Sequence, residues 1–315
     1  MANLKVVVCA VGFIACTYTS TALGAFRDIG VGARPLGMGG AFVALADDGS
    51  AANYNAAGLG FIDKTYVNAT LAQRFRGLIN YQYFGSVLPI GGAGTLGASI
   101  GILSESSDIY TERTLQFSYG KAFSEKISFG LNFKSFGINY DEYEEYVRQL
   151  STEGTTSASA FTADVGVLLK SAAGLSLGLS AENLVPADVS VFDSANADSV
   201  PVSFRAGLAY NLAGIAENTQ QEALREILRS GIGLVEVEFR NGENHVRAGA
   251  EVWLNKSVAV RAGYGIKNAI NSATTLALGG SAKISTFMQF DYAFQLLTGH
   301  LEDNTTQRVS FNLIF

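Results

Sequence analysis

The stretch that decides the fold is residues 127–134, Ile-Ser-Phe-Gly-Leu-Asn-Phe-Lys. Its odd positions are all apolar, and its even positions are all small or polar. Successive side chains of a β-strand point to opposite faces, whereas those of an α-helix repeat about every 3.6 residues. The stretch therefore predicts a β-strand with one apolar and one polar face.

The same alternation recurs from about residue 64 to the end of the sequence, in runs of about ten residues separated by breaks. About fourteen strands result, an even number within the range of single-chain membrane barrels, whose alternate residues face lipid and lumen. We therefore expect an all-β fold, a transmembrane antiparallel up-and-down β-barrel. The predicted strands lie near 64–73, 78–88, 93–103, 112–122, 126–139, 158–169, 174–183, 200–211, 230–240, 243–253, 257–266, 273–283, 286–297 and 305–315.

The fifth predicted strand contains one irregularity. Its apolar residues change from odd to even positions at Phe136 and Ile138. One inserted residue near Lys134 or Ser135 would produce this change of face, so the pattern predicts a β-bulge there.

The connections between the strands have unequal lengths. If the first strand rises from the periplasm, the longest external connections are 104–111, 140–157 and 184–199, and the periplasmic ones are short except for 212–229. Long external loops and short periplasmic turns are typical of bacterial barrels. The sorting favours the barrel independently of the strand count.

Two of these connections carry apolar side chains. Residues 220–229 place theirs at helical spacing, which predicts a short amphipathic helix that is either a lid on the barrel mouth or a partner-binding helix. The loop 140–157 is either an amphipathic capture surface or an ordinary solvated loop. Its side chains of interest are Tyr140, Tyr143, Tyr146, Val147 and Leu150.

The composition suits a protein that faces lipid. Hydrophobic residues make up 48% of the chain and charged residues 16%, compared with a usual charged share of about 25%. A soluble array of β-sandwiches is the alternative. The net charge of −6, without a basic tract, excludes nucleic acid as an expected partner.

Residues 1–25 are predicted to be an export signal that is removed. Lys5 provides the positive charge, and residues 6–16 form an apolar core too short to span a bilayer. Cleavage before Ala25 places Ala22 and Gly24 at the −3 and −1 positions, and cleavage one residue later fits nearly as well. A buried N-terminal helix and a lipoprotein signal are the alternatives.

Both cysteines, Cys9 and Cys16, fall inside this signal. The mature chain would then contain no thiol for a disulfide, a metal site or a nucleophile. At the other end, Val309, Phe311, Leu313 and Phe315 share one strand face. This aromatic end resembles the signal by which outer-membrane proteins reach their assembly machinery, so we expect a location in the outer membrane of a Gram-negative-type bacterium.

Residues 26–63 do not alternate and precede the barrel, which is predicted to span 64–315. Glycine lets a backbone lie close against a wall, aspartate caps short helices, and asparagine hydrogen-bonds in a polar lumen. We expect a hatch inside the lumen, with a periplasmic tail as the alternative. The residues expected to matter are Arg34, Gly37, Gly39, Gly40, Asp47, Asp48, Asn53, Asn55 and Gly58.

Residues 33–44 (Ala-Arg-Pro-Leu-Gly-Met-Gly-Gly-Ala-Phe-Val-Ala), 47–51 (Asp-Asp-Gly-Ser-Ala) and 55–59 (Asn-Ala-Ala-Gly-Leu) resemble the FadL superfamily, and more closely its PorV/PorQ-type branch. The stretches 246–254 and 260–264 also look like later strands of that family. The resemblance implies a fourteen-stranded barrel that transports small hydrophobic molecules. One departure is Ala56, where the family carries a proline, so any kink there is less constrained.

The strand parity places several charged side chains inside the barrel. Oppositely charged residues cluster on neighbouring strands, and buried charges persist when they are paired. The cluster is either a network that braces the barrel and hatch, which Arg34 could join, or a binding or selectivity site. The interior residues are Asp164, Glu182, Arg205, Glu236, Glu238, Arg240, Arg247, Glu251, Arg261, Lys283 and Asp291, with the cluster comprising Arg205, Glu236, Glu238, Arg247, Glu251 and Arg261.

The sequence offers little for catalysis. Its two histidines, His245 and His300, lie at predicted external strand ends and in no arrangement typical of a hydrolase. There is no metal-ligand spacing and no phosphate-binding glycine loop. We expect neither an enzyme nor a cofactor.

Two functions follow from these observations. The first is a transport barrel for small hydrophobic molecules, as the FadL resemblance implies. The second is a non-transporting partner in a protein secretion system, like PorV. A general porin fits less well, because the hatch would obstruct a wide channel. Expected partners are outer-membrane lipid, the assembly machinery, a hydrophobic ligand or a secretion-system protein.

Overall fold

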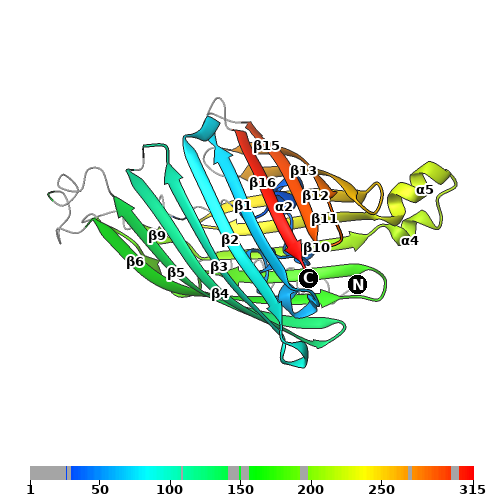
Figure 1. Cartoon of the computed structure of the whole chain (residues 1–315), viewed down its shortest axis with the longest axis horizontal. Helices are drawn as coiled ribbons and strands as arrows, with labels where there is room; N and C mark the ends of the chain where they lie inside the picture. The colour runs from blue at the N-terminus through cyan, green and yellow to red at the C-terminus, as the bar shows by residue number, and fades with distance from the viewer. Residues whose placement is uncertain are drawn as a thin grey trace.

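The computed structural model describes residues 30–107, 109–140, 156–191, 198–268, 272–298 and 305–315, together with residues 26 and 149. Within these residues, fourteen strands form one closed antiparallel barrel in the order β1-β16-β15-β14-β13-β12-β11-β10-β7-β6-β5-β4-β3-β2 (Figure 1). The remaining two, β8 and β9, form a separate small sheet. The predicted fold class and strand count are confirmed.

The barrel strands are between 8 and 15 residues long. They are β1 (Tyr66–Arg74), β2 (Ile79–Pro89), β3 (Thr95–Glu105), β4 (Tyr110–Ser124), β5 (Ile127–Tyr140), β6 (Ser157–Lys170), β7 (Leu175–Glu182), β10 (Ser203–Asn211), β11 (Gly231–Arg240), β12 (Glu243–Trp253), β13 (Val258–Asn268), β14 (Ala273–Lys283), β15 (Met288–Thr298) and β16 (Thr305–Ile314). The short strands are β8 (Ala187–Asp188) and β9 (Ser199–Val200), and the helices are α2 (Ala33–Gly37), η1 (Ala51–Asn53), η2 (Ala56–Phe61), η3 (Phe75–Gly77), η4 (Gly91–Ala93), α4 (Ala213–Ala216) and α5 (Glu222–Arg229).

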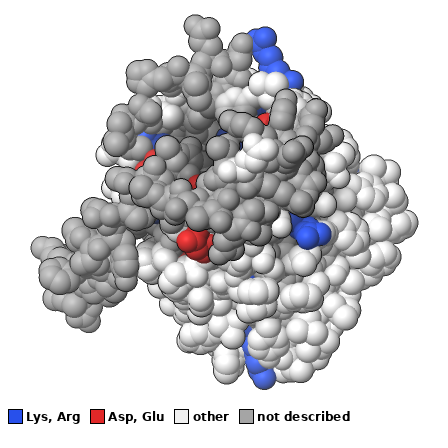
Figure 2. All heavy atoms as spheres, turned by 90° about the vertical axis from the view of Figure 1, so that its left-hand side faces the viewer, with Lys and Arg blue, Asp and Glu red and all other residues white. Residues whose placement is uncertain are grey.

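The outer wall of the barrel is apolar. Leu131, Phe161 and Leu278 are 56%, 57% and 65% exposed, and their strand neighbours turn inward. Figure 2, a view from the left of Figure 1, shows a wall in which very few described residues carry charge. Such a surface matches the apolar band that a membrane barrel presents to lipid.

The two ends of the barrel differ. The strand pairs β3–β4, β5–β6 and β7–β10 are connected at one end, which we call the loop end. At the other, the turn end, the connections are short except for residues 212–230, which contain α4 and α5, and β16 ends there. The predicted helix at 220–229 is confirmed as α5, which follows α4 and lies beyond the strand ends (Figure 1). Tyr143, Tyr146, Val147, Leu150 and the predicted signal 1–25 lie outside the described residues.

The predicted β-bulge near Lys134 is wrong. Strand β5 pairs residue by residue with β4 and β6 through this region, and the register shift on β4 lies at Ala122/Ser124 instead. Phe136 and Ile138 point into the lumen and are 5% and 3% exposed. The apolar residues change face because the lumen itself is apolar at the loop end.

Residues 30–63, here called the hatch, lie inside the barrel. Among the described residues, no helix is long and apolar enough to cross a membrane. The hatch lies directly against glycines on the inner wall, where any added Cβ would overlap hatch backbone or, at Gly166, the Asn55 side chain. These wall glycines are Gly130 on β5, Gly166 on β6, Gly178 on β7 and Gly263 on β13.

Candidate functional site

Glu236 on β11 fastens the middle of the hatch to the wall. Its Oε2 accepts hydrogen bonds from the backbone N–H groups of Phe42 (2.8 Å) and Val43 (2.9 Å). Its Oε1 accepts a hydrogen bond of 3.1 Å from Arg247 Nη1. The Glu236 side chain is 1% exposed, so its charge is fully partnered away from water.

Arg247 joins this anchor to a second carboxylate. Its Nη2 donates to Glu238 Oε2 over 2.5 Å. Glu238 also lies 3.6 Å from Arg205 Nη2 and accepts a hydrogen bond of 2.9 Å from Ser203. The arrangement alternates charge sign across β10, β11 and β12, which is the condition under which buried charges are stable.

Glu251 on β12 is the centre of a second group. It accepts hydrogen bonds from Arg34 Nε (2.8 Å) on the hatch and from Arg261 Nε (2.5 Å) on β13. Arg261 continues to Asp291 at 3.3 Å. Within the described residues, no group of three or more histidine, cysteine, aspartate or glutamate side chains is placed to hold a metal ion.

Arg34 completes this group by holding the hatch loop. Its Nη1 lies 2.5 Å from Asp47 and 3.0 Å from Asp48. Burial disfavours the charged form of Arg34, but Asp47, Glu251 and Asp48 outweigh it and raise the pKa of the guanidinium well above its usual value. Arg34 therefore stays charged and links three carboxylates.

The other sequence-predicted hatch residues contact the wall or the hatch itself. Asp48 accepts hydrogen bonds from the backbone and hydroxyl of Ser50 and so stabilises a turn, rather than capping a helix as expected. Asn53 donates to Tyr83 on β2, and Asn55 donates to Val167 on β6. The close glycine contacts are Gly37 with Gly279, Gly39 with Tyr264, Gly40 with Arg247 and Gly58 with Ala46.

Asn55 also caps the short helix η2, whose first residue is Ala56. Its side chain accepts a hydrogen bond of 3.1 Å from Ala57 N at the start of η2. The first turn is thereby fixed without the ring of a proline.

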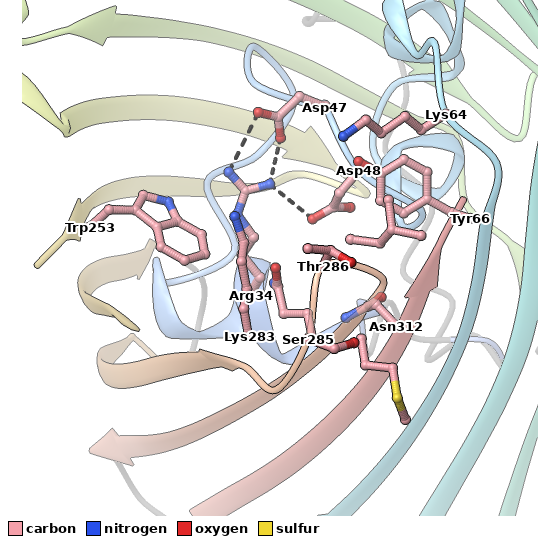
Figure 3. Close-up of a pocket in the computed structure, with 13 residues that line it drawn as sticks. Arg34, Asp47, Asp48, Lys64, Tyr66, Trp253, Lys283, Ser285, Thr286 and Asn312 are labelled. Carbon is pink, nitrogen blue, oxygen red and sulfur yellow. Dashed lines mark hydrogen bonds and ion pairs between the residues drawn. The ribbon is translucent and has the colours of Figure 1, made fainter. Parts of the chain in front are cut away.

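A charged cavity opens between the hatch and the turn end. It has a volume of about 290 Å³, and Arg34, Asp47 and Asp48 form its hatch side (Figure 3). Across from them, Lys283 Nζ lies 4.1 Å from the centre of the Trp253 ring. The remaining lining residues are Lys64, Tyr66, Ser285, Thr286, Met288, Gln289, Asn312 and Ile314.

The loop end of the lumen is lined differently, by a buried apolar group that we call the loop-end cluster. Strand β5 contributes part of it, and the segment after β7 folds inward to contribute the rest. Sequence reasoning missed it, although the change of face at Phe136 was its signal. The cluster comprises Phe26, Phe136, Ile138, Ala187, Val189, Val191 and Val200, with Tyr110, Tyr140, Ala158 and Ala160 packed against it.

The lumen thus has three levels. From the loop end to the turn end these are an apolar cluster, a hatch held by paired charges, and a charged cavity. The six clustered charges predicted from parity all belong to the middle level.

Comparison by sequence gives no match to a family model and none to a curated protein. Comparison by structure gives matches that cover most of the chain. The Pseudomonas putida toluene transporter TodX superposes with a TM-score of 0.63 at 11% identity, covering 91% of this chain and 99% of TodX. The CymD monoaromatic hydrocarbon channel gives 0.62 at 12% identity, with 92% and 98% covered.

A Pseudomonas aeruginosa FadL homologue gives a TM-score of 0.60 at 10% identity, with 90% of this chain and 98% of that chain covered. Identities this low establish the shared fold alone. By that measure, the chain has the fourteen-stranded barrel fold of FadL-type outer-membrane channels.

Proposed function

We propose that the chain carries small hydrophobic molecules, such as monoaromatic hydrocarbons, across an outer membrane from its loop end. The loop-end cluster is the observation that supports this most directly. A lumen that admitted only water and ions would not bury Phe136, Ile138 and Val189 at one mouth. The solved structures that share the fold include channels for toluene and for monoaromatic hydrocarbons.

The middle level of the lumen supports the same proposal. The hatch lies against walls on several strands, and its anchors are paired charges, which leaves polar solutes no wide aqueous path. An apolar molecule gains free energy on entering the loop-end cluster, at about 25 cal/mol per Å² of buried surface. Selectivity would then come from the apolar mouth and the closed hatch together.

Uptake of isotope-labelled toluene tests the proposal, in a Gram-negative host without its own channel for it. Cells with the chain should accumulate toluene several-fold faster than cells without it. Ile138→Thr should slow uptake about fivefold or more, because an unpaired hydroxyl in an apolar site costs roughly 1–3 kcal/mol.

Val87→Thr is the matched control. Val87 is 1% exposed and lies outside the loop-end cluster, among apolar residues that the hatch and the barrel wall bury together, so this variant reports the general effect of a buried hydroxyl. Equal slowing by both variants, or a sugar entering as fast as toluene, would contradict the proposal.

We also propose that the chain is exported by the signal at 1–25, with 26–63 as the hatch and 64–315 as the barrel, and that it resides in the outer membrane. The apolar outer wall supports a place in a membrane, because Leu131, Phe161 and Leu278 are exposed on it. Sedimentation with outer-membrane markers after cell fractionation is the expected result.

A second candidate, a PorV-like partner role in protein secretion, is supported by α4 and α5. Both helices lie beyond the barrel at the turn end, and Ile215, Leu224 and Ile227 are 46%, 42% and 45% exposed. In a secretion partner, a photo-reactive group at position 227 should cross-link to a secretion component. Replacing Leu224 and Ile227 by glutamate should abolish that cross-link and leave toluene uptake unchanged. Absence of any cross-link leaves transport as the sole proposal.

A further inference from the structure

The loop-end cluster holds one residue from the start of the chain in an unusual setting. The Phe26 ring lies 4.4 Å from that of Phe136, and the residue is 9% exposed. Its backbone N donates to Glu112 Oε1 over 3.1 Å, and its carbonyl accepts from Arg240 Nη2 over 2.9 Å. Side chains from β4 and β11 therefore hydrogen-bond to both backbone groups of this one residue.

Glu112 is a half-buried carboxylate that makes no ion pair with a described side chain, although the charge of Arg240 acts on it from nearby. Besides Phe26 N, it accepts a hydrogen bond of 2.9 Å from the Tyr110 hydroxyl. Among the described residues, no lysine, arginine or histidine lies within ion-pair distance of it, in contrast to Glu236, Glu238 and Glu251. A carboxylate held partly away from water is stabilised by a nearby positive charge.

The backbone of Phe26 is also strained as an internal residue. Its φ is 55°, in the left-handed region that bulky L-residues seldom adopt. That strain arises from the preceding carbonyl. An N-terminal residue has no preceding carbonyl and so has no such strain.

We propose that the mature chain begins at Phe26, and that its α-ammonium group is the cation that pairs with Glu112. A signal peptidase would hydrolyse the Ala25–Phe26 amide with water, leaving a carboxylate on Ala25 and an ammonium on Phe26. Of the two cleavage positions that the sequence allows, this one alone removes the strain and places the charge at Glu112. Cleavage before Ala25 would leave Phe26 N a neutral amide and move the charge about 3.8 Å along the chain.

The intact mass of the wild-type protein, extracted from outer membranes, tests the cleavage. A mass equal to residues 26–315 is expected. A mass equal to residues 25–315, or to any other start, overturns the proposal. This measurement needs no variant and is independent of whether the barrel transports anything.

The pairing is tested by Glu112→Gln, which keeps an acceptor but removes the charge. At pH 6.5 in detergent, this variant should unfold at a temperature about 5–10 °C below that of the wild type. At pH 9.5 this difference should shrink by more than half, because an α-amine has an ordinary pKa of about 8. Among the described residues, the titratable and charged groups around Glu112 are Tyr110, Arg240 and Asp198.

Asp48→Asn is the matched control. Asp48 pairs with Arg34 over 3.0 Å, and the neighbouring carboxylates hold the pKa of this guanidinium well above its usual value, so it stays charged at both pH values. The loss of stability in this control should therefore be the same at both pH values. If Glu112→Gln also loses the same stability at both pH values, Glu112 does not pair with an α-ammonium.

Discussion

Glu236→Ala is expected to be among the most damaging single substitutions in the lumen. It leaves the N–H groups of Phe42 and Val43 buried without an acceptor, and it removes one of the two carboxylates that Arg247 binds. Breaking a buried ion pair costs about 3–5 kcal/mol, and each unsatisfied donor about 1–3 kcal/mol. We expect a loss of at least about 4 kcal/mol in the free energy of unfolding, measured by urea denaturation in detergent with Trp253 fluorescence.

The same substitution should loosen the hatch. Glu236 is the side chain that ties the Phe42–Val43 backbone to β11, so the variant should show a higher and noisier ion conductance in planar bilayers. Glu226→Ala on α5 is the control, because its ion pair with Arg229 is exposed and surface pairs contribute little. A Glu236→Ala protein with wild-type stability and conductance would show that the hatch is held elsewhere.

Gly263→Ala should destabilise the protein by a similar amount, because it adds an atom where there is no room rather than removing a partner. The added Cβ would overlap the backbone of Met38 and Gly39, which cannot rotate out of the way as a side chain could. Overpacking costs typically about 1–3 kcal/mol and more where backbone must move. We expect a loss of about 3 kcal/mol in the free energy of unfolding. In detergent gels of heated samples, the variant should change from the compact to the unfolded band at a lower temperature than the wild type.

Gly233→Ala on β11 provides the comparison for this prediction. No atom beyond the neighbouring residues lies within 4 Å of the position that its Cβ would occupy. This variant should migrate and unfold like the wild type. Equal destabilisation by both substitutions would mean that glycine matters in these strands for backbone reasons and not for contact with the hatch.

The barrel itself was predictable because its rule is local. Lipid-facing residues must be apolar along every strand, so stretches such as 127–134 reveal both the strand and its outer face. The same parity places Glu236, Arg247 and Glu251 in the lumen, where the structure finds them paired.

The content of the lumen could not be predicted in the same way. The change of face at Phe136 has two explanations, a shifted register or an apolar lumen, and only the position of the segment after β7 distinguishes them. The cavity between Trp253 and the hatch depends likewise on distant segments meeting in space. Local patterns report what faces the solvent, which here is lipid, but not what fills an enclosed space.

The wall glycines have a consequence for the order in which the protein forms. The hatch is in close contact with β5, β6, β7 and β13, and the chain continues from it into β1. A segment held this tightly between opposing walls has no clearance to slide into a finished tube. We therefore expect the sheet to wrap around a hatch already in place, with the seam between residues 66–74 and 306–314 joining last.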